Sequence, residues 1–210
     1  MMNIGDEDRP MYVYRTLMPE QKAEVLRTRA LRRYPPHSPP HLLDVEGWFL
    51  VTAATLEHQH RFQAEQDRAW LLEELFAELN AVGVDFAGWV ILPNHYHLLV
   101  QCHPLGIVSE PLRRVHARTA RELNRRAGVM GRQVWYRYTD RAIRDQRHYY
   151  TTLNYIHYNP VKHAHAQKPM EWECSSVHWY AEHFGVERLR NAWVEYPVRD
   201  YGKGWDWPGL

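Results

Sequence analysis

The pattern of apolar and polar positions predicts alternating strands and helices through the middle of the chain. Residues 47–56 are rich in aromatic and β-branched side chains and predict a strand. Residues 63–82 carry apolar side chains close to helical spacing and stop at Gly83, so they predict a helix. Residues 86–92 and the stretch after a Pro-Asn break, up to Gln101, then predict the two strands of a hairpin.

A second group of elements follows the hairpin. A helix is expected from a Ser109 N-cap to Ala127, and its inward stripe consists of Leu112, Val115, Thr119 and Leu123. A strand is expected within residues 133–143. A third helix is expected to begin near an Asp145 cap and to end at Asn159, because Pro160 disfavours helical geometry in the residue before it.

The order strand, helix, strand, strand, helix, strand and helix defines the fold class. It predicts an α+β, ferredoxin-like βαββαβ antiparallel sheet with both crossover helices on one face. The additional C-terminal helix, which ends at residue 159, is left to cover the other face.

The length of 210 residues suits one well-buried domain with decorations. We expect residues 1–45 to form an N-terminal extension, with a basic helix-like run at 21–33 and a Pro-rich linker after it. The main domain is expected at residues 46–168. The aromatic residues 169–210 predict a loop-rich tail that packs on or near this domain.

A His-Tyr-His triplet lies on the second strand of the predicted hairpin. Because side chains alternate along a strand, His95 and His97 point to one face while Tyr96, Leu98 and Val100 point to the other. Two adjacent imidazoles can hold a divalent metal, although a pair of polar residues on a half-solvated strand fits this pattern as well.

The third helix carries side chains that can complete such a site. Tyr155 and Asn159 are four residues apart, so they share a face, beside the packing stripe of Tyr149, Leu153 and Ile156. Two histidines and an amide oxygen form a neutral, partly open shell suited to Mg²⁺ or Mn²⁺. A divalent cation that polarises a phosphate lowers the barrier for attack by a tyrosine hydroxyl. Tyr155 is preferred as nucleophile over Tyr158, which lies further round the helix.

Charge is distributed unevenly along the chain. Residues 113–168 contain eleven Arg and two Lys against three acidic residues, a net charge of +10, so the remainder carries −9 of the total of +1. Such asymmetry favours a polyanion partner, although a solvated helix face offset by acidic neighbours is the alternative. The predicted DNA contacts are Arg113, Arg114, Arg118, Arg121, Arg125, Arg137, Arg141 and Lys162.

The remaining composition bears on the compartment. No apolar run approaches the length of a membrane span, and no signal sequence opens the chain. The two cysteines, Cys102 and Cys174, make no disulfide framework. These features predict a cytoplasmic protein, and a DNA partner would associate it with the nucleoid.

The motifs WVILPNHYHLLV and YIHYNPVK occur in order, with LNRRAG and GRQVWYRYTDRAIRD between them and EWECSSVHWY after them. Together they resemble the REP-associated tyrosine transposases of the HUH single-tyrosine transposase superfamily, over roughly residues 47–180. The resemblance implies a ferredoxin-like catalytic domain that cleaves single-stranded DNA near hairpin-forming repeated palindromes. The products would be a 5′-phosphotyrosine and a free 3′-hydroxyl.

The resemblance assigns roles to four residues. His95 and His97 match the HUH histidines, Tyr155 the nucleophile, and Asn159 the helix residue that completes the metal site. Two positions depart from the usual pattern: Tyr96 stands where an aliphatic residue is common, and many insertion-sequence relatives carry Gln in place of Asn159. Relatives include dimers that exchange the tyrosine helix and monomers, so monomer and homodimer both stay open.

Two other functions are compatible with parts of the sequence. A metal-dependent hydrolase could use the H-x-H pair, but no H-E-x-x-H motif occurs and no Asp-His pair follows the triplet. A catalytically silent nucleic-acid-binding protein could use the same ferredoxin-like sheet. The intact set of two histidines, a tyrosine and an asparagine argues against it.

Overall fold

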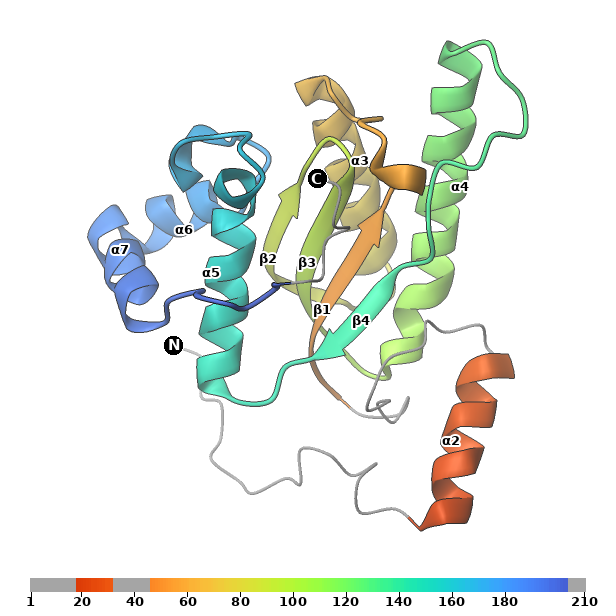
Figure 1. Cartoon of the computed structure of the whole chain (residues 1–210), viewed down its shortest axis with the longest axis horizontal. Coiled ribbons are helices and arrows are strands. Elements are labelled where there is room, and N and C mark those ends of the chain that lie inside the picture. The colour runs from red at the N-terminus through yellow and green to blue at the C-terminus, as the bar shows by residue number, and fades with distance from the viewer. Residues whose placement is uncertain (1–17, 32–45, 204–210) are drawn as a thin grey trace.

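The computed structural model describes residues 18–31 and 46–203, which form an antiparallel sheet with helices on both faces (Figure 1). The order of the strands across the sheet is β2-β3-β1-β4. The strands are β1 (Gly47–Ala54), β2 (Asp85–Ile91), β3 (His95–Cys102) and β4 (Thr139–Ala142). With α3 (Glu65–Asn80) and α4 (Ser109–Arg126) as crossovers, this is the predicted ferredoxin-like βαββαβ fold.

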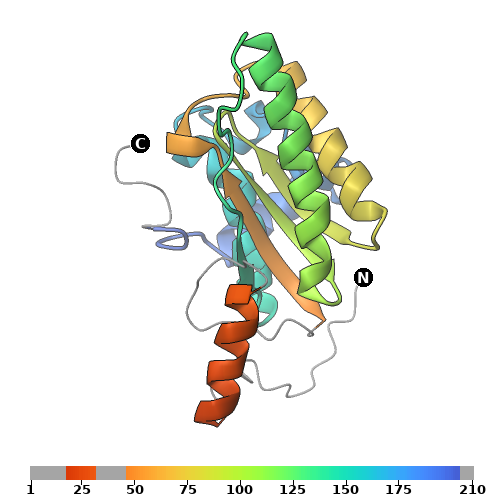
Figure 2. The ribbon, with the colours of Figure 1, turned by 90° about the vertical axis from the view of Figure 1, so that its right-hand side faces the viewer.

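Helices α3 and α4 lie side by side on one face of the sheet (Figure 2). The core beneath them contains Tyr96, Leu98 and Val100 of β3, all 0% exposed. The predicted inward stripe of α4 is buried in the same core. Alternation along β3 therefore directs His95 and His97 to the opposite face, as the sequence predicts.

Helix α5 (Gln146–Lys162) covers that opposite face. Its Leu153 and Ile156 pack against Leu50, Val90 and Leu99 of the sheet, with further contact from Leu92. A β-bulge at the start of β2 precedes Gly88. A Cβ atom at that glycine would lie only 2.7 Å from Leu153 Cδ1, so the missing side chain lets α5 approach the sheet closely.

Both ends of α5 bear on the sequence prediction. The Asp145 carboxylate accepts a hydrogen bond from the His148 backbone N–H at 2.7 Å, which confirms the predicted N-cap. The predicted end at Asn159 is wrong, since the helix continues through Pro160 to Lys162. Proline removes one backbone donor, but Pro160 and Asn159 are buried and the turn closes with a His163 N–H to Asn159 C=O bond of 3.1 Å.

Two further expectations need correction. Ser109 is the first residue of α4 and does not cap it; its hydroxyl lies 2.8 Å from the Tyr138 hydroxyl instead. Residues 169–203 contain more helix than expected, namely α6 (Val177–Phe184) and α7 (Val186–Glu195), separated by Gly185. Both helices lie beside α5 on the side away from α4 (Figure 1).

The N-terminal extension is described only in part. The basic run forms helix α2 (Pro19–Leu31), which projects away from the sheet (Figure 2). The Pro-rich linker and the last two tryptophans, Trp205 and Trp207, lie outside the described residues. Within residues 18–31 and 46–203, no helix is both long and apolar enough to cross a membrane.

Candidate active site on the α5 face of the sheet

The two histidines lie in the middle of the sheet, where their backbone is held from both sides. β3 pairs antiparallel with β1 and with β2, and Thr52 is the partner of His97 in the register with β1. The side chains are nearly enclosed, since His95 is 5% and His97 2% exposed. Their ring centroids are 5.1 Å apart. Such a pair is rigid and can present two nitrogen atoms to one point.

A hydrogen bond fixes which nitrogen of His95 is available. Asn94 Nδ2 donates to the carbonyl oxygen of His58 at 3.2 Å, which turns Asn94 Oδ1 toward His95 Nδ1 at 2.7 Å. A carboxamide oxygen can only accept, so His95 Nδ1 carries a hydrogen. A neutral His95 therefore has its lone pair on Nε2, the nitrogen that faces α5.

His97 is held in a similar way. Its Nδ1 lies 2.7 Å from Thr52 Oγ1 on the neighbouring strand. Burial, together with the nearby His95, His163 and Lys162, holds the pKa of His97 well below its ordinary value. The ring is therefore neutral at physiological pH, which is the state required of a metal ligand.

Helix α5 brings the other two predicted residues to the histidines. The Tyr155 hydroxyl lies 3.4 Å from His97 Nε2, and Asn159 Oδ1 lies 3.0 Å from His95 Nε2. Tyr155 and Asn159 are one helical turn apart, and each faces one of the two rings along β3. The structure thus brings together all four residues that the motifs single out.

The donor set suits a divalent cation. When His95 is neutral, its Nε2 and the facing Asn159 Oδ1 both carry lone pairs, so a cation between them would be attracted by both. Asn159 Nδ2 is buried and has no hydrogen-bond partner among the described residues. Within residues 18–31 and 46–203, no three His, Cys, Asp or Glu side chains form a metal-binding group, so an amide oxygen would have to complete this one.

The C-terminal segment encloses the Tyr155 ring. Tyr155 is only 1% exposed, and the Tyr201 ring packs edge-on against it with centroids 5.5 Å apart. A Cβ atom on Gly202 would clash with Tyr155 Cε2, and this residue has a positive φ of 82°. Lys162 lies over the same ring at 5.0 Å and donates to the Gly202 carbonyl at 3.2 Å. A cation and a tight backbone contact therefore cover the phenol.

The competing tyrosines of α5 point elsewhere. Tyr149 packs in the apolar cluster under the helix, and Tyr150 stacks on Tyr196 with centroids 4.8 Å apart. Tyr158 contacts the Trp193 ring edge-on at 5.1 Å. Of the α5 tyrosines, only Tyr155 has a hydroxyl for which a hydrogen bond to either histidine is found among the described residues.

Three further histidines lie in or just after the last turns of α5, and one of them is fully buried. His157 is completely buried, its Nε2 lies 3.1 Å from Ser176 Oγ, and burial lowers its pKa to about 3. His163 packs its ring against His95, with centroids 4.9 Å apart. His165 lies near Trp172 and His60, further from the site.

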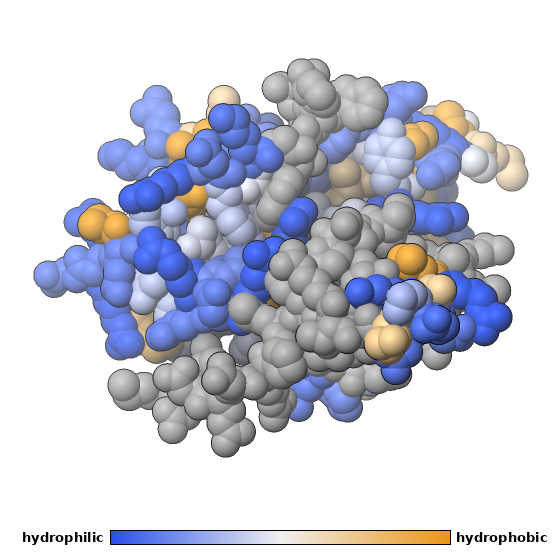
Figure 3. Space-filling model, turned by 60° about the horizontal axis from the view of Figure 1, so that its bottom comes forward, coloured by the Kyte–Doolittle hydropathy of each residue, from blue (hydrophilic) through white to orange (hydrophobic). Residues whose placement is uncertain are grey.

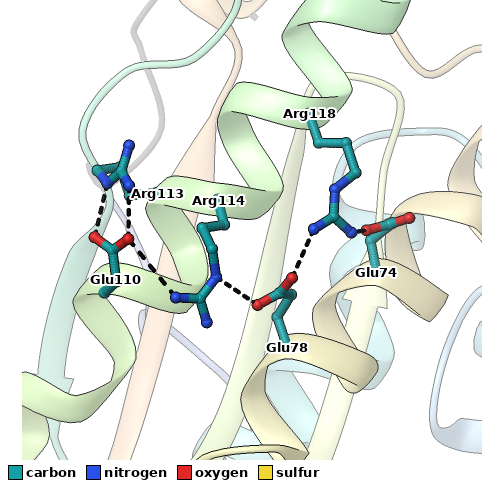
Figure 4. Close-up of polar contacts among 6 residues, drawn as sticks. All are labelled: Glu74, Glu78, Glu110, Arg113, Arg114 and Arg118. Carbon is teal, nitrogen blue, oxygen red and sulfur yellow. Dashed lines mark hydrogen bonds and ion pairs between the residues drawn. The ribbon is translucent and has the colours of Figure 1, made fainter.

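The arginines of α4 lie on the other side of the sheet, and most are engaged in ion pairs (Figure 4). Arg114 and Arg118 share Glu78, with nitrogen to oxygen distances of 2.7 Å each, and Arg118 also pairs with Glu74. Arg113 pairs with Glu110, and Arg125 with Glu122. A phosphate would have to replace these carboxylates, so DNA binding by this row stays a prediction.

The other predicted DNA contacts are placed differently. Arg141 pairs with Leu50 in the sheet register, so its side chain leaves β4 on the face that α5 covers. Lys162 is adjacent to the phenol, and Arg121 and Arg137 are exposed. Figure 3 shows a largely hydrophilic face outside the grey residues, with scattered hydrophobic side chains. Arg141 and Lys162 are thus the predicted cations that share the site's side of the sheet.

Three residues of the site were not identified from the sequence: Thr52, Asn94 and His163. Asn94 directly precedes His95, and a side-chain acceptor beside a ligating histidine is a signal that could have found it. Thr52 needed the register between β1 and β3, which the sequence does not define. His163 is four residues after Asn159 and so shares its helical face, although it follows the proline that was taken to end the helix.

The four residues that the sequence motifs single out therefore meet on one face of a ferredoxin-like sheet. No family model matches the chain. Over 102 residues it is 30% identical to a Haemophilus influenzae protein described as "Putative REP-associated tyrosine transposase". This alignment covers 42% of this chain and 56% of that protein. The chain thus matches little more than half the length of that curated relative.

A solved structure gives a second comparison. A REP-associated tyrosine transposase bound to a REP hairpin superposes with a TM-score of 0.57 at 20% sequence identity, covering 70% of this chain and 87% of that one. This likeness shows the shared fold. The sequence relative supports the resemblance that the motifs indicate, and the solved structure supports the predicted fold.

Proposed function

We propose that this protein cleaves single-stranded DNA next to hairpin-forming repeated palindromes and transfers the strand through a covalent bond to Tyr155. The observation that carries the proposal is the pair of contacts made by α5. The Tyr155 hydroxyl is 3.4 Å from His97 Nε2, and Asn159 Oδ1 is 3.0 Å from His95 Nε2. A nucleophile thus lies directly beside three donors that suit one cation.

The covalent step balances without an external energy source. The Tyr155 oxygen attacks the scissile phosphorus and forms a phosphotyrosine at the 5′ side, while the bond to the 3′ oxygen breaks. The phenol proton is lost to solvent and the leaving 3′ oxygen takes one up, giving a free hydroxyl. Reversal by another 3′-hydroxyl rejoins the strand, so the step amounts to strand transfer.

His95, His97 and Asn159 would hold a divalent cation, Mg²⁺ or Mn²⁺, which would withdraw charge from the phosphate when bound. The protein's own contributions are separate from that effect. Asn94 and Thr52 orient the imidazoles, and burial keeps His97 neutral. Lys162 lies 5.0 Å from the phenol ring, so it would place a positive charge near a phosphate bound beside Tyr155.

The positive charges near the site and the solved structure of a similar protein support a DNA hairpin as partner. The solved structure is of a REP-associated tyrosine transposase bound to a REP hairpin, and we extend a hairpin partner to this chain. Lys162 and Arg141 would contact the phosphate backbone of the DNA near the site. Such contacts set the affinity for DNA and its salt dependence. Because Tyr155 is 1% exposed, binding has to displace side chains that cover its hydroxyl.

The test is the formation of a covalent adduct. The full chain is incubated with Mn²⁺ and end-labelled DNA hairpins that carry single-stranded flanks, and the products are separated under denaturing conditions. We expect a labelled band at the mass of the protein plus the DNA fragment. Tyr155→Phe should abolish this band while changing DNA affinity less than about threefold, because only the attacking oxygen is lost.

Tyr158→Phe is the matched control, since it removes a hydroxyl one turn away that contacts neither histidine among the described residues. It should retain the adduct. Loss of the adduct in Tyr158→Phe and its persistence in Tyr155→Phe would show that the nucleophile is misassigned. Cleavage without an adduct would favour a metallohydrolase, and binding without cleavage a silent binding protein.

A further inference from the structure

A cavity of about 540 Å³ lies between α5, α7 and the segment that follows α7. Its walls include Tyr155 itself, together with Tyr158, Trp193 and Tyr201. Small-molecule sites occupy roughly 300–1,000 Å³, so a mononucleotide unit fits this volume. The cavity therefore adjoins the proposed nucleophile, and the proposed cleavage step does not use it.

We propose that this cavity receives one unpaired nucleotide of the DNA strand, from the single-stranded region next to the cleaved bond. The inference rests on the proposed function and adds a base-binding subsite to it. Tyr158 and Trp193 meet edge-on, with centroids 5.1 Å apart and planes at 77°. One of the two rings can therefore stack on a base while the other contacts its edge.

The charges around the cavity suit a phosphodiester. Among the described residues, three cationic side chains line it, from Lys162, Arg199 and Lys203, against one carboxylate, that of Asp200. Lys203 lies 3.5 Å from Asp200, but both side chains are more than 80% exposed, so this ion pair is weak and open to exchange. An anionic backbone with a flat apolar base matches both the cations and the aromatic walls.

Two buried polar atoms of the wall residues lack partners within the described part of the chain. One is a donor, Trp193 Nε1, and the other an acceptor, Asn154 Oδ1. Asn154 Nδ2 is already used, because it donates to the carbonyls of Ala192 and Tyr196 at 2.9 and 2.8 Å. Buried polar groups are seldom left without partners, and every nucleobase offers both donors and acceptors at its edge. Both atoms are enclosed in the unbound protein, so a base would have to shift the wall side chains before its edge could pair with them.

The experiment scans the single-stranded flanks of a DNA hairpin with the full-length protein. An abasic site replaces each flank nucleotide in turn, and affinity is measured without metal, so that cleavage does not interfere. We expect one position at which loss of the base weakens binding roughly tenfold. 2-Aminopurine at that position should lose fluorescence on binding, since it stacks on Trp193.

Variants of α7 assign this effect to the cavity. Trp193→Ala should bind intact DNA about as weakly as the wild type binds the abasic DNA, and should no longer distinguish the two. Trp193→Phe keeps a ring and should restore most of the distinction. Val194→Ala is the matched control, because this neighbouring side chain is 81% exposed. If Trp193→Ala fails to fold, the 2-aminopurine signal and the abasic penalty of Trp193→Phe still test whether a base stacks on this residue.

An unchanged abasic penalty in Trp193→Ala would overturn the inference, as would the absence of any sensitive flank position while the wild type forms its adduct. These results differ from failure of the proposed function, in which no DNA yields an adduct. A Trp193-dependent position without an adduct would support the subsite and leave the chemistry refuted.

Discussion

Helices α4 and α5 lie on opposite faces of one sheet, and they use polar residues in opposite ways. α4 carries six arginines, and ion pairs with residues such as Glu74, Glu78, Glu110 and Glu122 hold five of them in place. α5 has few charges, yet it carries the phenol and the amide that meet the histidines. The positive charge along the sequence therefore suggests α4 as the functional helix, whereas the candidate catalytic residues lie on α5.

The difference lies in how completely polar atoms are satisfied. On α4, both amide atoms of Asn124 bond to Arg132, at 2.7 and 2.9 Å. On α5, Asn159 faces a histidine lone pair with its oxygen, and its nitrogen has no partner within residues 18–31 and 46–203. A satisfied group stabilises the fold, whereas a group left partly unsatisfied in a buried site is available to a ligand.

The largest expected effect is that of changing these two asparagines. Asn159→Ala removes a proposed cation ligand, so Mn²⁺ affinity and adduct yield should fall by roughly 100-fold. Asn124→Ala should lower the free energy of unfolding by about 1–3 kcal/mol and leave Mn²⁺ affinity unchanged. Titration calorimetry with Mn²⁺ and urea unfolding measure the two quantities. Equal losses of Mn²⁺ affinity would remove the distinction between the helices.

The next effect concerns pH and the α4 side of the sheet. His116 stacks on Trp135 with centroids 4.5 Å apart, its Nε2 is 2.9 Å from the Tyr96 hydroxyl, and burial lowers its pKa to about 3. The folded state thus keeps this ring neutral at pH values where the unfolded chain takes up a proton. Its contribution to stability is complete above pH 6.5 and is lost as the pH falls toward 3.

Between pH 7 and pH 5, this group alone should lower the free energy of unfolding by up to about 2 kcal/mol. His116→Phe does not titrate, so urea unfolding at the two pH values should show a smaller loss in the variant than in the wild type. Other buried histidines contribute equally to both proteins and cancel in this comparison. An identical pH dependence in both proteins would mean that His116 is not neutral in the fold.

The smallest expected effect is on DNA affinity. Lys162→Ala removes a cation beside the phenol, so the slope of log affinity against log salt should decrease by about one and affinity by a few-fold. Arg118→Ala should change affinity less than twofold, because this guanidinium is paired with Glu74 and Glu78. Fluorescence anisotropy at several salt concentrations measures both. A larger effect of Arg118→Ala would establish α4 as a DNA-binding surface.

Much of the fold is predictable from the sequence because its signals are local. The period-two pattern around His95 and the helical stripe of α4 each identify an element and its buried face. Helices α6 and α7 were missed because each is short, with eight and ten residues, so only two or three helical turns carry the pattern. The continuation of α5 through Pro160 depends on burial and on contacts with the sheet, which no local pattern contains.

The sequence predicts the four central residues of the candidate site but not the residues that orient them. The spacing of Tyr155 and Asn159, and of His95 and His97, places each pair on one face of its element. The residues that orient the pairs depend on strand register and on chain packing, so Thr52 could not be identified from spacing. The ion pairs of α4 were also hidden, because their acidic partners Glu74 and Glu78 come from a helix far away in the sequence.

Gly88 determines how near α5 can come to the sheet, and so how near the phenol and amide can come to the imidazoles. A methyl group at this position would meet Leu153 at 2.7 Å, and either that side chain or the whole helix would have to give way. A residue outside the candidate site thus limits how closely the proposed nucleophile can approach the imidazoles. Replacing Gly88 first with Ala and then with larger residues would increase the distance between α5 and the sheet in steps. Reactivity would then change although every proposed reactive group keeps its native chemical form.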